Sequence, residues 1–299
     1  MAGTEPPAPA GPADGPRGWP ALALVYNALV WGLSWWPLRA LQDMGLHPLW
    51  TTAWVHGWAV LLLTLVQPGM WRTLLASGAL WALALASGLT NLSFNWAVTH
   101  GDVVRVVLLF YLMPAWAVLL AWPLLGERPD AAAAGRVLLG LTGVALVLWP
   151  DGGGWPWPRD MHDWLGVAGG FCFALTNVLL RRQRAVPAAA RVLAMFAGGT
   201  LAALAVAAAG FGPAHPPAAT GWLLATVAIG LVLISSNVAL QFGATRLPAQ
   251  LTALIMLSEV FFAALSAALL GAGELTPNVL AGGLLVVLAA AWSARSGRG

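Results

Sequence analysis

Ten apolar runs of about twenty residues each follow one another along this chain, and they restrict the folds that it can adopt. In a bilayer, only helices and closed barrels satisfy every backbone polar group, and runs of this length are typical of membrane-spanning helices. A soluble domain carries about 25% charged residues, whereas 8% of this chain is charged. The sequence therefore predicts an all-α integral membrane protein. Its ten expected spans cover approximately residues 20–41, 47–67, 72–98, 102–125, 131–149, 163–184, 188–211, 219–243, 248–270 and 276–296.

Several classes of protein are excluded by composition. All 14 cationic side chains are arginines, and they are scattered through the breaks between apolar runs, which argues against a nucleic-acid-binding face. The single cysteine rules out an internal disulfide and a Cys-based zinc site. Without lysine there is no phosphate-binding GxxxxGK[ST] loop. We therefore expect no nucleic-acid partner, no metal and no cofactor.

Orientation is predicted from the arginines, because cytoplasmic loops carry the excess of cationic residues. With the N-terminus in the cytoplasm, 11 of the 14 arginines fall on the cytoplasmic side. Only Arg39, Arg105 and Arg159 fall on the other side. We expect a multi-pass protein with both termini in the cytoplasm.

The two halves of the chain resemble each other. We predict a disordered cytoplasmic tail over 1–18, rich in Pro, Gly and Ala, a first five-helix repeat over 19–149 and a second over 150–299. Because five is an odd number, the repeats have opposite orientations. Inverted repeats are typical of secondary transporters, which hold a solute between the repeats near the middle of the bilayer. The aligned segments are 31–39 with 173–181, 90–100 with 236–246, and 112–135 with 257–282.

A stripe of polar residues follows the third expected span, and the eighth span repeats it. Because its members are four residues apart, each stripe lies on one slowly drifting helix face. Amides that face lipid cost several kcal/mol each without partners, so both stripes must face protein or water. Two interpretations stay open: polar groups that join helices, and a polar cavity shared by the repeats. The stripes are Ser87, Asn91, Asn95 and Thr99, and Asn237, Gln241 and Thr245.

A proline lies twelve residues before a Gly-Glu pair, at Pro114, Gly126 and Glu127. With ten spans in two inverted repeats, this pattern resembles the drug/metabolite transporter superfamily, of the EamA type. The run THGDVVRVVLLFYLMPAWAVLLA at 99–121 is similar to the corresponding run of the YddG amino-acid exporters. The resemblance implies a basket-like fold, a cavity lined by spans one, three, four, six, eight and nine, and export across the bacterial inner membrane. It also implies that Tyr111 and Phe173 are the aromatic residues of spans four and six.

Glu259 is the only acidic residue deep in an expected span. An intramembrane carboxylate is costly and therefore indicates a function by default, here a proton site or a site for a substrate amine. Met256 and Ser266 share its helical face. The alternative is a protonated acid bonded to a neighbouring carbonyl. The family often has proline at this position of the second repeat, so Glu259 departs from the pattern.

Other side chains are weaker candidates for coupling or gating. His56 lies in the middle of the second span and is either a proton relay or a packing residue. Arg105, with Asp102, opens the fourth span as a gate or as an ordinary interfacial pair. Pro114 interrupts the fourth span and frees a backbone carbonyl, which suits a hinge. The remaining substrate-binding candidates are Trp31, Ser34 and Asn177, beside the stripe amides, Tyr111, Phe173 and Met256.

The sequence favours a secondary transporter that exports amino acids, with aromatic or other apolar ones as candidates, and related small metabolites by alternating access. Its expected partners are the solute and the lipid bilayer, and a monomer is its expected state. A facilitator and a proton-coupled exporter of drugs or other metabolites stay open, as does a membrane scaffold or receptor. An enzyme is not expected, because no Gly-x-Ser pattern stands beside a buried base.

Overall fold

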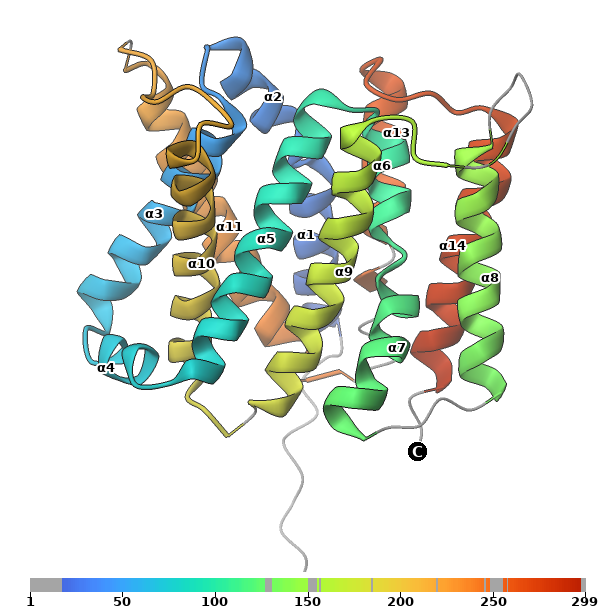
Figure 1. Ribbon diagram of the computed structural model, residues 1–299, viewed down its shortest axis with the longest axis horizontal. Helices are drawn as coiled ribbons and strands as arrows, with labels where there is room; N and C mark the ends of the chain where they lie inside the picture. Colours follow the sequence, from blue (N-terminus) through green and yellow to red (C-terminus); the bar gives the residue numbers. More distant parts are fainter. Residues whose placement is uncertain are drawn as a thin grey trace, which may run out of the picture.

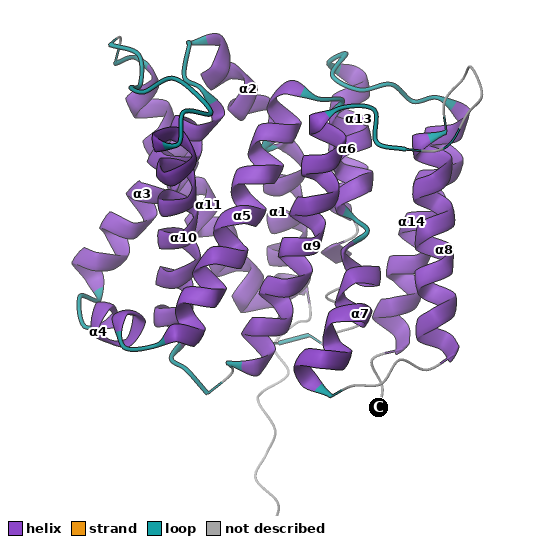
Figure 2. Ribbon diagram, in the orientation of Figure 1, coloured by secondary structure: helices purple, strands orange, loops and turns teal. Residues whose placement is uncertain are grey.

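The computed structural model describes residues 18–126, 131–149, 155, 157–183, 185–218, 220–244, 246–247, 255–256 and 258–296. Within these residues every regular element is a helix, and no strand is present (Figure 2). Residues 1–17 of the expected tail, Thr245 and residues 248–254 of the expected ninth span lie outside the described residues. The helices are α1 (Gly18–Leu33), α2 (Trp35–Asp43), α3 (Pro48–Val66), α4 (Met70–Leu75), α5 (Gly78–His100), α6 (Val103–Phe110), α7 (Met113–Leu125), α8 (Ala131–Leu148), α9 (Met161–Arg182), α10 (Ala188–Ala208), α11 (Trp222–Ala244), α13 (Ser258–Leu269) and α14 (Pro277–Ser296).

Helices lie on each of the ten expected spans, so the prediction of an all-α membrane protein is confirmed. The pair α1–α2 forms the first span and the pair α6–α7 forms the fourth. Seven helical stretches of the described chain are long and apolar enough to cross a membrane, and α13 and the first part of α14 are shorter apolar helices. The 23-residue helix α5 is not among them. Its polar stripe lowers its hydropathy, and it lies between α9 and α10 (Figure 1).

The helices run side by side between two ends of the molecule (Figure 1). The upper end in that view carries the α5–α6 and α13–α14 connections, and the lower end carries α4. The repeat alignment matches α1–α2 to α9, α3 to α10, α5 to α11, α6–α7 to α13 and α8 to α14. Helix α5 packs on α9, and its counterpart α11 packs on α1; likewise α6 and α7 pack on α9 while α13 packs on α1. Helices α3 and α10 pack on each other, as do α8 and α14. These packing partners correspond when the two halves are exchanged.

Two helix pairs cross at glycines. A Cβ atom on Gly198 of α10 would overlap the carbonyl oxygen of Ala84 on α5, and one on Gly88 would overlap the carbonyl oxygen of Gly198. Gly143 of α8 and Gly282 of α14 meet in the same way. Small residues permit such close approach, and the gain in van der Waals contact holds membrane helices together where lipid offers no hydrophobic drive.

The fourth span is interrupted at Tyr111 and Leu112, between α6 and α7. Proline at position 114 has no N–H group, so the carbonyl of Phe110 receives no helical hydrogen bond from it. Gly170 of α9 packs against this carbonyl, and a Cβ atom at that position would overlap it. Pro114 therefore explains why the fourth span bends where it does. The first span shows a milder interruption at Ser34, three residues before Pro37.

Candidate functional site

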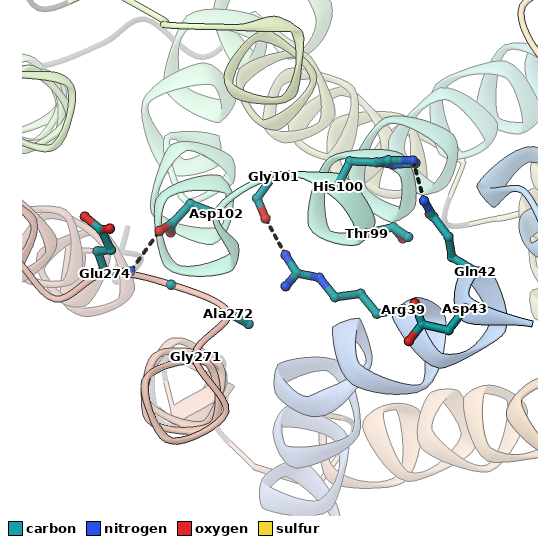
Figure 3. Close-up of a pocket in the computed structure, with 11 residues that line it drawn as sticks. Arg39, Gln42, Asp43, Thr99, His100, Gly101, Asp102, Gly271, Ala272 and Glu274 are labelled. Carbon is teal, nitrogen blue, oxygen red and sulfur yellow. Dashed lines mark hydrogen bonds between the residues drawn. The ribbon is translucent and has the colours of Figure 1, made fainter.

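A polar cavity of about 590 Å³ opens at the upper end of the molecule (Figure 3). We call it the vestibule. It brings together the end of α2, the α5–α6 connection and the α13–α14 connection, which come from both halves of the chain. It is lined by Arg39, Gln42, Asp43, Thr99, His100, Gly101, Asp102, Gly271, Ala272, Gly273 and Glu274.

Charges of both signs line the vestibule. The Arg39 side chain points across it in Figure 3, and it donates from Nε to the carbonyl of Val98 at 3.0 Å and from Nη2 to that of Gly101. These bonds occupy carbonyls at the end of α5, where a cation is favourable. Asp43 and Asp102 interact electrostatically with the same guanidinium. A zwitterionic solute would therefore find an attractive group of either sign in this cavity.

Below the vestibule, the interrupted fourth span meets α13. The Tyr111 hydroxyl donates to the carbonyl oxygen of Met256 at 3.4 Å and interacts with the carboxyl group of Glu259. Tyr111 is buried, and Glu259 is half-buried. Gly32 of α1 packs against the backbone of Glu259, where its own Cβ would lie 2.8 Å from the carbonyl oxygen. An acidic side chain, a phenol and a helix break thus meet where the halves of the chain cross.

Three members of the α5 stripe are buried and Asn91 is half-buried. Asn95 donates to the Thr52 hydroxyl of α3 at 3.1 Å, and Asn91 donates to the carbonyl of Ser87 at 2.8 Å. The stripe therefore joins α5 to α3 in this structure, which is one of the two interpretations left open by the sequence. Only its last member, Thr99, also lines the vestibule.

His56 belongs to the same polar layer. It is 2% exposed, its Nδ1 lies 2.9 Å from the carbonyl of Thr52, and its side chain interacts with that of Asn91. Its ring packs on Phe196 of α10, and Gly199 makes room for it. This histidine is therefore held between α3, α5 and α10 and is remote from the vestibule lining.

The side chain of Arg105 pairs with that of Asp163 and not with that of Asp102. Its Nε lies 2.8 and 2.9 Å from the two carboxylate oxygens of Asp163, and its Nη1 donates to the carbonyl of Val147 at 2.7 Å. Asp102 instead caps α6 by accepting the backbone N–H of Arg105. Sequence reasoning missed Asp163 because it stands at the start of its span, 58 residues away.

The other candidates are dispersed. Ser34 is buried and bonds to the carbonyl of Trp31 at 2.7 Å, while Trp31 itself is half-buried. Phe173 packs on Phe110 at 5.4 Å between ring centres, and Asn177, which is exposed, bonds to its own helix at the carbonyl of Phe173. Asn237 is half-buried and has a partner. The side chains of Gln241 and Pro114 lie outside the described residues.

A second polar contact between the halves was not expected. Asn27 of α1 is 1% exposed and donates to the carbonyl and the hydroxyl oxygen of Ser236 on α11, at 2.9 and 2.6 Å. Nearby, the hydroxyl groups of Tyr26 and Ser235 lie 2.7 Å apart. An asparagine in the middle of an apolar run is itself the signal that could have revealed this contact.

Histidines gather beside the vestibule, at the ends of the helices. His100 and His162 stack at 5.7 Å, and His47 lies 6.4 Å from His100. Partial burial, and then the neighbouring charge of His100, lower the pKa of His47. In the described part of the chain no group of three or more His, Cys, Asp or Glu side chains could hold a metal ion.

Comparison with known proteins supports a membrane transporter of small molecules. Residues 18–149, which hold α1 to α8, match the model of the EamA-like transporter family. No curated protein matches the chain. A solved structure titled only "Crystal structure of protein" is 21% identical, covers 95% of this chain and 100% of its own, and superposes with a TM-score of 0.57. That likeness shows a shared fold over nearly the whole length.

Proposed function

We propose that this protein is a secondary transporter of the EamA type, which exports amino acids and related small metabolites by alternating access. The match of residues 18–149 to that family supports a transporter of small molecules. We propose that an internal repeat extends the argument to the second half, and the aligned segments and corresponding packing partners of the two halves support this. Inverted repeats that meet at interrupted helices are the usual site of solute binding in such proteins.

The observation that carries the proposal is the meeting of Tyr111 with Glu259 at the break between α6 and α7. A carboxylate inside the membrane is retained at a cost, so it has a task. At the crossing of the two halves, it can hold the ammonium group of an amino acid or a proton that exchanges with it. Trp31 and Phe173 are the aromatic residues that we propose to contact an apolar side chain of the solute.

The vestibule is the proposed exit. Arg39 can attract a carboxylate, and Asp43 and Glu274 can attract an ammonium group, so its lining suits a zwitterion better than a solute of one charge. We propose that the stripe amides Asn91, Asn95, Asn237 and Gln241 contact solute when the helices that carry them move apart. With the lower end in the cytoplasm of a bacterium, the protein carries solute outward across the inner membrane as a monomer.

Radiolabelled amino acids tested for counterflow in sealed proteoliposomes check this function. We expect exchange of at least one amino acid, with Glu259→Gln reducing the rate at least tenfold, on the order of the effect of losing one acid–base group. Asp160→Asn is the control, since Asp160 is exposed on its loop. A pH gradient that drives net flux indicates proton coupling, and equal rates without it indicate a facilitator. No flux of any amino acid would leave other metabolites, or a membrane scaffold or receptor, as the better class.

A further inference from the structure

Three ties join the two repeats at the first turn of α6. The backbone N–H of Val103 donates to the carbonyl of Ala272 at 3.0 Å, and the backbone N–H of Glu274 donates to the carboxylate of Asp102 at 2.8 Å. The third is the Arg105–Asp163 ion pair. We call these ties the clasp. All of them run from the first repeat to the second, and all lie at the upper end.

The ion pair is the strongest member of the clasp. Its side chains are 9% and 5% exposed, so water screens the two charges little. The Asp163 carboxylate also accepts the backbone N–H of Arg159 at 2.8 Å, which fixes it in place. Nη2 of Arg105 is buried without a partner in the described part of the chain. Separating α6 from α9 at this end would therefore break charge-assisted bonds that are already made.

The second repeat lacks the charged side chains that would build the same clasp at the lower end. The counterpart of the α6 turn lies in 247–254 (LPAQLTAL), which holds no charged residue. The alignments before and after this turn, 90–100 with 236–246 and 112–135 with 257–282, differ by one residue in register. Arg105 therefore aligns with Leu251 or with Gln250, and neither is a cation. The counterpart of Asp163 is Ala21, and α1 (GWPALALVYNALVWGL) has no acidic residue at all. By this sequence alignment, the ion pair has no counterpart at the lower end.

We propose that the clasp holds the upper end closed and makes the state that opens at the lower end the resting state. This inference rests on the proposed transport function. In an inverted repeat the two open states are made by exchanging the conformations of the halves, so ties present at one end only bias the equilibrium. If the lower end faces the cytoplasm, as the arginines predict, the resting protein is open to cytoplasmic solute, which is the direction an exporter needs.

A substrate-free labelling experiment tests the clasp separately from transport. Leu109 lies on α6 one turn below Arg105, is fully buried, and packs where α9 passes at Gly166. In a Cys172→Ser background, Leu109→Cys reports opening of the upper end through its rate of reaction with a membrane-impermeant maleimide. Arg105→Gln combined with Asp163→Asn should raise this rate about tenfold or more, since close buried charge pairs couple by at least that factor.

Matched variants make each outcome decisive. Asp43→Cys, an exposed position of the vestibule lining, should label in every background and shows that the reagent has access. Asp160→Asn removes the exposed ion pair with His162 at the start of α9, keeps a side-chain oxygen that can cap this helix, and should leave the Leu109→Cys rate unchanged. Asp102→Ala removes a weaker tie and should give a smaller increase in the Leu109→Cys labelling rate. This variant tests the clasp if the double variant does not fold. An unchanged Leu109→Cys rate in the double variant, or in Asp102→Ala when the double variant is lost, overturns the proposal, whether or not the protein transports amino acids.

Discussion

Replacing Asp163 by asparagine should destabilise the protein far more than its place at a helix end suggests. The substitution keeps the shape of the side chain but removes its charge, and it leaves the guanidinium of Arg105 buried, with the Val147 carbonyl as its remaining strong acceptor. Breaking a buried ion pair in this way costs about 3–5 kcal/mol. For a chain of this size, that corresponds to a fall in Tm on the order of 5–15 °C.

A double variant separates the effect of the charge from that of the contact. Arg105→Met with Asp163→Leu removes both charges and fills a similar volume. Replacement of a buried pair by apolar residues is often neutral. Here the backbone N–H of Arg159 also loses its acceptor, so we expect a net cost of about 1–2 kcal/mol. The double variant should therefore be more stable than Asp163→Asn alone.

Thermal unfolding in detergent, followed by the loss of monodisperse protein, measures these differences. Asp160→Asn is the control, because the Asp160 side chain is 58% exposed and its pair with His162 contributes little. If Asp163→Asn unfolds within about 2 °C of the wild type, or if the double variant is the less stable of the two, the guanidinium is solvated and the ion pair does not lie in a water-poor interface.

Two further predictions follow from packing and charge. Gly198→Ala should lower stability by about 1–3 kcal/mol, because its Cβ overlaps the Ala84 carbonyl. Gly57→Ala, where a Cβ has nothing within 4 Å, should instead raise stability by about 0.5–1 kcal/mol. Equal melting temperatures of the two variants would show that α5 and α10 separate freely. Burial lowers the pKa of His47 below its ordinary 6.5, so the folded state binds this proton less readily than the unfolded chain and loses stability as pH falls through that value. His47→Gln should therefore lose less Tm between about pH 7.5 and 5.5 than the wild type, and an identical slope would contradict this.

Much of the fold could be predicted from local sequence signals. Apolar runs of sufficient length can only be helices in lipid, so the ten spans, their breaks and the all-α class follow from hydropathy. The interruption before Pro114 is also local, since a missing N–H acts within one turn. The site was harder to predict. Glu259 and Tyr111 were each named from the sequence, and only their opposition across the break between α6 and α7 required the structure.

The sequence by itself determined that this chain is a bundle of membrane helices, because helix formation and burial in lipid depend on neighbouring residues. Only the tertiary structure decided which partner each buried polar group finds. Asn95 bonds to Thr52 on α3, 43 residues away, and Asn27 bonds to Ser236, 209 residues away. Hydrogen bonds and ion pairs depend on distances of a few ångströms between atoms, and spacing along the chain does not fix such distances between separate helices.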